Sequence, residues 1–121
     1  MLNQDLYEEI SNILRTGNLS MFRGTPEGQH GGIYVQALEQ AFRDFFGVRY
    51  AIALNSATAG LHCALLAGGI GEGDEVLVSP YSFSSSASCV LMVGAKPIFV
   101  DIEDKTFGFD FEDGLRKTNK N

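Results

Sequence analysis

The stretch FGVRYAIALNSATAGLHCALL, residues 46–66, contains the change of hydrophobic pattern that decides the fold. Residues 48–54 alternate large and small side chains, which is typical of a β-strand. Residues 55–58 are short and polar, and they predict a sharp turn. The alanine- and leucine-rich residues 59–67 predict a helix. The stretch therefore indicates a strand, a turn and a helix in immediate succession.

Two helices are expected on the amino-terminal side of this stretch. Apolar residues recur at helical spacing within residues 6–14, and Gly17 predicts the end of that helix. A second apolar stripe occupies residues 35–46 and ends at Gly47. The glycine-rich residues 24–32 predict a loop between the two helices.

On the carboxyl-terminal side, strand and helix patterns alternate. The glycine-rich residues 68–74 end the preceding helix. Residues 75–78 and 97–100 predict strands, and residues 82–93 predict a helix that stops at Gly94. Strands that alternate with helices at this spacing predict an α/β domain with a parallel sheet.

Composition restricts the partners of the chain. Its 121 residues make about one small domain, and 9 basic against 15 acidic residues give a formal net charge of −6. An acidic balance without a basic stripe argues against nucleic acid or an anionic membrane as a partner. The acidic net charge does not exclude a small anionic ligand, because backbone amides can bind phosphate without net basic charge. The last residues, 110–121, turn polar and are expected to be an interruption rather than a designed finish, with Lys117 and Lys120 in a frayed tail.

No pattern in the sequence indicates export, a membrane span or a metal site. The first residues show no basic segment followed by an apolar core, so we expect no signal peptide. Apolar runs such as residues 89–95 are too short to cross a bilayer. Cys63 and Cys89 lack paired spacing, so we expect buried, reduced thiols in a cytoplasmic protein. His30 and His62 have no ligand partner three or four residues away, and we expect no metal.

The turn at residues 55–58 is the sharpest candidate for chemistry. Small hydroxyl residues at a helix start leave backbone N–H groups free, and these groups attract an anion. Simple helix capping by Ser56 or Thr58, worth about 1 kcal/mol, is the alternative. Both interpretations stay open on these residues alone. Residues 71–73 precede a strand, and residues 24–32 lack Gly-Lys-Ser/Thr, so neither fits a nucleotide-binding motif.

Three blocks, in order and at matching spacing, carry a family resemblance. They are residues 46–66, residues 71–78 (GEGDEVLV) and residues 81–101, which begin YSF and end GAKPIFVD. The set resembles the DegT/DnrJ/StrS family of nucleotide-sugar aminotransferases, which depend on pyridoxal 5'-phosphate (PLP). Ala57 stands where that family usually has glycine, and Gly60 where it usually has alanine.

The resemblance implies an α/β fold, namely the N-terminal part of the type I PLP-dependent transferase (aspartate aminotransferase-like) large domain. Residues 1–121 would comprise the N-terminal helices and the first part of this PLP-binding domain, with the C-terminal remainder absent and an incomplete, parallel-rich sheet. Residues 48–54 would lie at one edge of the sheet and pair with a later strand. Residues 75–78 and 97–100 would lie side by side at the opposite edge.

The resemblance also implies roles for three residues. Ala57 and Thr58 would bind the phosphate of PLP, and Phe83 would stack on its pyridine ring. Both roles suit the physics of an anion at a helix start and of a flat ring beside an aromatic. The alternative for Phe83 is one more aromatic in the core. The Schiff-base lysine of the family is expected outside this chain, so we assign no catalytic residue and no metal ligand.

The implied reaction moves an amino group, probably from glutamate, to a keto sugar carried on a nucleotide. The complete enzyme would be a cytoplasmic homodimer in sugar biosynthesis for cell-surface polysaccharide, whereas this chain alone would be inactive. Two alternatives stay open. One is a PLP-dependent sugar dehydratase of the same fold, with histidine in place of the lysine. The other is a non-catalytic remnant that serves as an interaction module.

Overall fold

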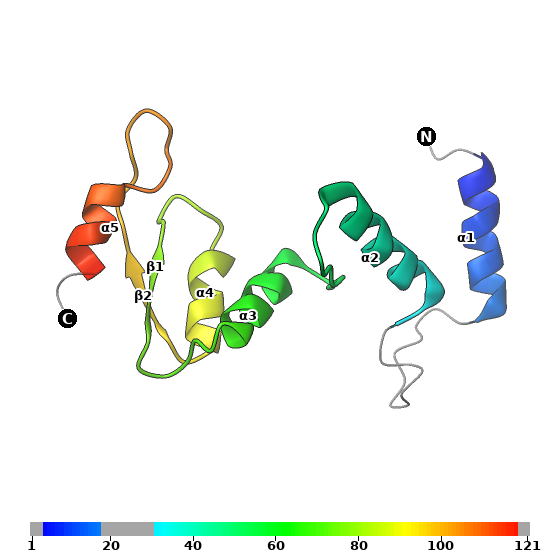
Figure 1. Cartoon of the computed structure of the whole chain (residues 1–121), viewed down its shortest axis with the longest axis horizontal. Coiled ribbons are helices and arrows are strands. Elements are labelled where there is room, and N and C mark those ends of the chain that lie inside the picture. Colours follow the sequence, from blue (N-terminus) through cyan, green and yellow to red (C-terminus); the bar gives the residue numbers. More distant parts are fainter. Residues whose placement is uncertain (1–3, 18–30, 119–121) are drawn as a thin grey trace. The chain divides into compact units, whose positions relative to one another are not determined.

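The computed structural model describes residues 4–17 and 31–118, and the chain divides into a unit up to Ala53 and a unit from Leu54 onwards. The predicted loop at residues 24–32 lies outside the described residues apart from Gly31 and Gly32. The elements, in chain order, are α1 (Gln4–Thr16), α2 (Ile33–Phe46), α3 (Ala57–Ala67), β1 (Glu75–Val78), α4 (Ser85–Met92), β2 (Lys96–Phe99) and α5 (Phe111–Thr118) (Figure 1).

The first unit contains α1 and α2, and both helices end at the predicted glycines. Gly17, which follows α1, has a φ of 68°. Gly47 closes α2 with a φ of 64°, and its N–H donates to the carbonyl of Arg43. This left-handed backbone favours glycine, because a residue with a Cβ is strained there.

The strand predicted at residues 48–54 is wrong for the part of the chain that the structure describes. Residues 48–54 belong to no strand there, and the Ile52 side chain is 78% exposed. One amide of this segment, that of Ala53, donates to the carboxylate of Glu39 at 2.9 Å. A strand needs a neighbour for its N–H and C=O groups, and no described segment provides one. The alternating side chains of residues 48–54 therefore favour a strand, but the described residues provide no neighbouring strand with which this segment could pair.

The second unit is built on two parallel strands, as predicted. β1 and β2 pair in the register Glu75↔Lys96 to Val78↔Phe99. Lys96 and Glu75 also form an ion pair of 2.7 Å across the pair. Parallel neighbours need a crossover connection, and α4 supplies it. The predicted side-by-side placement of the two strands is confirmed, and β2 begins one residue earlier than expected.

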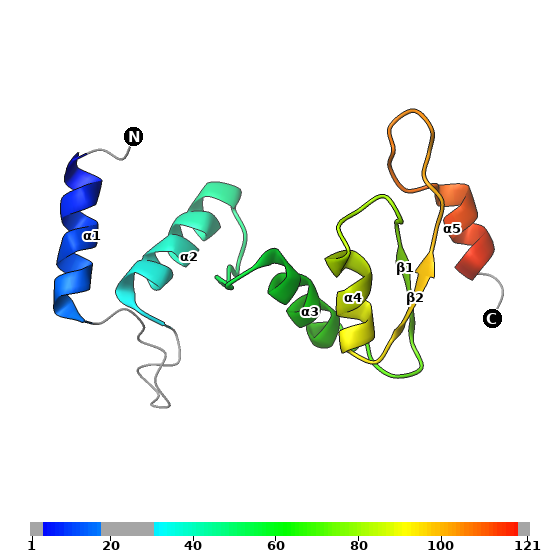
Figure 2. The same cartoon turned by 180° about the vertical axis from the view of Figure 1, so that it is seen from behind.

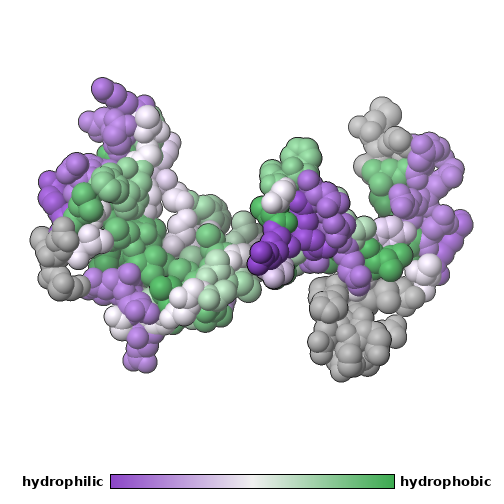
Figure 3. Space-filling view, in the orientation of Figure 1, coloured by the Kyte–Doolittle hydropathy of each residue, from purple (hydrophilic) through white to green (hydrophobic). Residues whose placement is uncertain are grey.

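Helices lie on both sides of this small sheet. α3 and α4 lie on one side and α5 on the other, in two opposite views (Figures 1 and 2). The core lies between β1 and α4, where Val78, Cys89 and Val90 are buried and Leu65 of α3 packs against them. Apolar surface also remains exposed over α3 and α4 (Figure 3), including Leu66.

Two expectations are corrected in this unit. Cys89 is buried as predicted, whereas Cys63 is exposed on α3, and both thiols are free. Lys117, expected in a frayed tail, instead lies in α5. This helix forms because Asp110 caps it: the Asp110 carboxylate accepts the amide of Asp113 at 2.9 Å.

Candidate functional site

α4 begins at the end of the sheet where β1 and β2 finish, and α3 lies beside α4 on the side away from the strands (Figures 1 and 2). The end where parallel strands finish is the edge at which ligands bind in open parallel sheets. The sequence-predicted residues come from the second unit: Ala57 and Thr58 begin α3, and Phe83 lies in the loop between β1 and α4.

The start of α3 combines a cap with unused donors. Ser56 has an extended backbone, and its hydroxyl accepts the amide of Ala59 at 3.1 Å. Among the residues that the structure describes, the amides of Ala57 and Thr58 and the hydroxyl of Thr58 have no hydrogen-bond partner. Capping and anion binding are therefore compatible here, because the cap uses a different amide.

These donors fit a phosphate group. Two adjacent amides and one hydroxyl at a helix start present N–H and O–H groups toward the same end of the helix. The partial positive charge of the helix dipole lies at the same place. Alanine at position 57 keeps the amide that glycine would supply, so the departure from the family pattern removes no donor.

Phe83 is not a core residue in this structure. Its side chain is 78% exposed. The loop that carries it is held by local hydrogen bonds: the amide of Tyr81 donates to the Ser79 hydroxyl at 3.3 Å, and the hydroxyls of Ser82 and Ser86 lie 2.7 Å apart. An exposed ring in an anchored loop is available for a flat ligand, as stacking requires.

A cavity of about 390 Å³ lies among α3, β1 and α4. Its lining is mainly apolar and includes Leu61, Leu65 and Val78. Ser79 and Ser82, from the loop that precedes α4, add hydroxyl groups to the lining. The cavity thus continues from the core toward the loop of Phe83.

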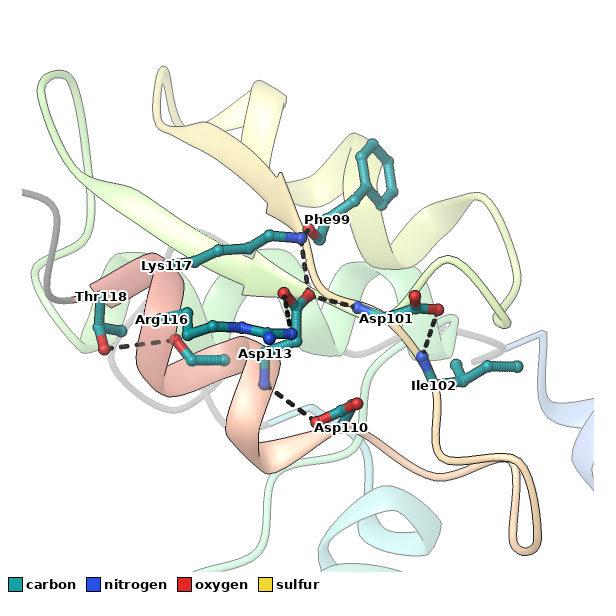
Figure 4. A network of polar contacts seen from close by, with 9 residues as sticks. Phe99, Asp101, Ile102, Asp110, Asp113, Arg116, Lys117 and Thr118 are labelled. Carbon is teal, nitrogen blue, oxygen red and sulfur yellow. Dashed lines mark hydrogen bonds and ion pairs between the residues drawn. The ribbon is translucent and has the colours of Figure 1, made fainter.

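A polar network fixes α5 to the end of β2 (Figure 4). Asp113 is 8% exposed and accepts the amide of Asp101 at 2.9 Å. Lys117 lies 2.7 Å and Arg116 3.2 Å from the same carboxylate. Lys117 also donates to the carbonyl of Phe99 at 2.6 Å. Hydrogen bonds from Lys117 and the Asp101 amide lower the pKa of Asp113 to about 2, against the opposing effect of burial.

Sequence reasoning missed this network, although a signal was present. Asp110 and Asp113 stand three residues apart, with Arg116 and Lys117 one turn further on. Acidic residues in the first turn and basic residues in the last turn are typical of a short capped helix. The network is structural, and it occupies the ammonium group of Lys117.

Within residues 4–17 and 31–118, no helix is both long and apolar enough to cross a bilayer. In the same residues, no group of three His, Cys, Asp or Glu side chains is placed to hold a metal ion.

Comparison with known proteins finds relatives for most of the chain. The family model for DegT/DnrJ/EryC1/StrS aminotransferases matches residues 15–118. The spore coat polysaccharide biosynthesis protein SpsC of Bacillus subtilis is 39% identical over 110 residues, which are 91% of this chain and 26% of SpsC. The GDP-perosamine synthase of Caulobacter vibrioides is 46% identical over 79 residues, which are 65% of this chain and 21% of the synthase.

Solved structures agree with the sequence relatives. The protein Spr1654 of Streptococcus pneumoniae, solved in a PLP form and a PMP form, matches 96% of this chain and 27% of its own, with a TM-score of 0.80 and 28% identity. The predicted fold class is confirmed, and PLP is the cofactor of solved relatives. The chain spans about a quarter of the length of these relatives. It belongs to the DegT/DnrJ/EryC1/StrS aminotransferase family.

Proposed function

We propose that residues 1–121 form the N-terminal helices and the first part of the PLP-binding large domain of a sugar aminotransferase. The remaining part of the large domain would complete the sheet and supply the Schiff-base lysine. The observation that carries this proposal is the start of α3, where the amides of Ala57 and Thr58 and the Thr58 hydroxyl are available to bind a phosphate. The chain belongs to a family of aminotransferases, which supports PLP as the source of that phosphate.

In the proposed enzyme, this chain holds and orients the cofactor. The amides of Ala57 and Thr58 and the Thr58 hydroxyl donate to the phosphate. Phe83 lies against a face of the pyridine ring and fixes its plane. When bound, PLP supplies the electron sink for amino transfer. The residues of this chain thus set the position of the reacting group without taking part in proton transfer.

The proposed substrate is a keto sugar linked to a nucleotide, with glutamate as the amino donor. The names of two relatives, a GDP-perosamine synthase and a spore coat polysaccharide biosynthesis protein, support a nucleotide sugar and a polysaccharide product. We place the complete enzyme in the cytoplasm as a homodimer, as the family resemblance implies.

The test uses the full-length protein that contains residues 1–121. It is titrated with PLP, and amination of keto-sugar nucleotides is then measured with glutamate as donor. We expect a saturable change in PLP absorbance and turnover that depends on both substrates. A folded protein that leaves the PLP spectrum unchanged would favour the interaction module, and PLP binding with loss of water from the sugar would favour the dehydratase.

Thr58→Val tests the phosphate site within this protein. Valine keeps the shape of threonine and removes the hydroxyl, so PLP affinity should fall by about 1–3 kcal/mol. Thr118→Val in α5 makes the same atomic change away from α3 and is the matched control. Equal PLP dissociation constants for the two variants would show that the Thr58 hydroxyl does not bind the phosphate and that residues 55–58 only begin a helix.

A further inference from the structure

The loop of residues 103–108, which follows β2, is held tightly by its own hydrogen bonds. The Glu103 carboxylate accepts the amides of Lys105 and Thr106 at 3.0 and 2.8 Å. It also accepts the Thr106 hydroxyl at 2.6 Å. The Glu103 backbone bonds at both ends of the turn: its carbonyl accepts the amide of Phe107 at 2.8 Å, and its N–H donates to Gly108 at 2.9 Å.

This scaffold forces one residue into an unusual backbone conformation. Phe107 has a φ of 57°, and no other residue besides glycine has a positive φ within the described residues. The left-handed region is unfavourable for a bulky aromatic side chain. Such strain persists where the surroundings impose it, and it concentrates at functional sites.

The strained residue contacts the loop that carries Phe83. The ring centroids of Phe107 and Tyr81 lie 5.5 Å apart with a tilt of 34°. Both rings remain exposed, so core burial does not account for the conformation of Phe107. Tyr81 stands two residues before Phe83 in the loop between β1 and α4. The contact therefore joins the two loops that follow β1 and β2.

This contact completes the anchoring of the Phe83 loop. Ser79 and Ser82 hold the loop to itself and to the start of α4. The Phe107 ring adds an anchor from a distant part of the sequence. A loop fixed before a ligand binds loses less conformational freedom on binding, which raises affinity.

We infer that Phe107 is a positioning residue: its ring holds Tyr81, and through Tyr81 it presents Phe83 to the cofactor ring. The inference rests on the proposed function, since it requires PLP at this edge of the sheet. Phe107 itself contacts neither cofactor nor substrate in this arrangement.

The experiment measures PLP dissociation constants, the absorbance of bound PLP and apo-protein melting on the full-length protein. Phe107→Gly removes the ring and accepts a positive φ without strain, so the loop should still form. We expect PLP binding to weaken about 3- to 10-fold, the range of an aromatic pair. Phe107→Tyr keeps the ring and should restore affinity to within about twofold of the original.

A double-mutant cycle tests whether Phe107 acts through Tyr81. Tyr81→Ala should weaken PLP binding as Phe107→Gly does, and the double variant should be no weaker than Tyr81→Ala alone. Phe111→Ala, which truncates an exposed phenylalanine of α5, is the control and should leave the dissociation constant unchanged.

Each outcome decides the inference. If the original protein binds PLP and Phe107→Gly binds it equally well, the positioning role is wrong and the proposed function stands. Additive losses in the double variant would also overturn it, because Phe107 would then act independently of Tyr81. If the original protein does not bind PLP, the proposed function fails and the inference with it. Should Phe107→Gly not fold, Tyr81→Ala decides alone, and an unchanged dissociation constant overturns the inference.

Discussion

Ser56 and Thr58 carry similar hydroxyl groups two residues apart, yet the structure gives them different surroundings. The Ser56 hydroxyl is occupied by the amide of Ala59, while that of Thr58 has no partner among the described residues. A hydroxyl without a protein partner at a helix start can donate to a ligand. Hydrogen-bond geometry therefore assigns the cap to Ser56 and leaves the Thr58 hydroxyl available for the proposed ligand, a distinction that the sequence alone left open.

Phe83→Ala separates stacking from core packing. Because the ring is 78% exposed, its removal should change the apo free energy of unfolding by less than about 1 kcal/mol. A core phenylalanine would instead cost about 3–5 kcal/mol. PLP affinity should fall about 3- to 10-fold, and Phe83→Tyr should bind PLP nearly normally. Apo-protein denaturation and PLP titration measure both effects. A large loss of apo stability with normal affinity would assign the ring to packing.

Residue types at the site were predictable, whereas contacts between distant residues were not. The pattern around Thr58 and Phe83 lies within short, ordered blocks, so it can be read along the sequence. The contact of Tyr81 with Phe107 depends on where two loops meet after folding. The positive φ of Phe107 carries no sequence signal, because glycine rather than phenylalanine is expected there.

Within α3, Gly60 is an unfavourable residue in a helix interior. A Cβ at this position would meet only the Leu54 side chain, at 3.8 Å, which is an ordinary contact. Gly60→Ala should therefore raise the free energy of unfolding by about 0.5–1 kcal/mol. Gly47→Ala is the contrasting control, since its φ of 64° strains alanine and should destabilise the protein. Urea denaturation of both variants measures the change in the free energy of unfolding. An increase for Gly47→Ala would contradict the argument from backbone conformation.

The carboxylate of Asp113 makes the attachment of α5 sensitive to acid. Its pKa is about 2 in the folded chain, below the usual value of 3.8, mainly because Lys117 donates to it. A lowered folded-state pKa stabilises the protein above the unfolded pKa, and this contribution disappears as the pH falls from about 4 to about 2. Asp113→Asn should therefore be less stable at pH 7, and the difference should shrink over that range.

Urea denaturation between pH 7 and pH 2 measures this dependence. Asp104→Asn, which changes an exposed aspartate in the preceding loop, is the control and should follow the original protein throughout. A difference between Asp113→Asn and the original protein that stayed constant down to pH 2 would show that the carboxylate charge is not the cause.

Helices were predicted more accurately than strands at the level of elements. Helix ends depend on local features such as Gly47, which acts within one turn. A strand depends on a partner, and the two strands that form are those that pair with each other. Residues 48–54 have the side-chain pattern of a strand and no described partner. The helix α5 was missed because its short polar sequence depends on capping rather than on an apolar stripe.

At the scale of the whole molecule, the two-stranded sheet leaves many large apolar side chains exposed. β1 pairs with β2 alone among the described strands, and the cavity beside β1 is lined mainly by apolar residues. An unpaired strand edge next to apolar surface is a place where further strands add. The division into two units follows from tertiary contacts, and no pattern along the sequence predicts it.

Residues 1–121 alone should have no transaminase activity. Lys96 and Lys117 are held in ion pairs, and the proposed function assigns the Schiff-base lysine to the remaining part of the large domain. The measurement is glutamate-dependent amination of a keto-sugar nucleotide, with free PLP as the background. The full-length protein at the same PLP concentration is the control. Turnover by the 121-residue chain above that background would contradict the assignment of no catalytic residue.

Chemical labelling of the two cysteines can measure how often the core of the second unit opens. Cys89 is 3% exposed and its thiol donates to the carbonyl of Ser86, whereas Cys63 is exposed on α3. A maleimide dye should attach to Cys63 at once and reach Cys89 only when the core opens. The ratio of singly to doubly labelled chain then reports the opening rate of the second unit, and a dye on Cys63 places a fluorophore on the helix that carries Thr58 in its first turn.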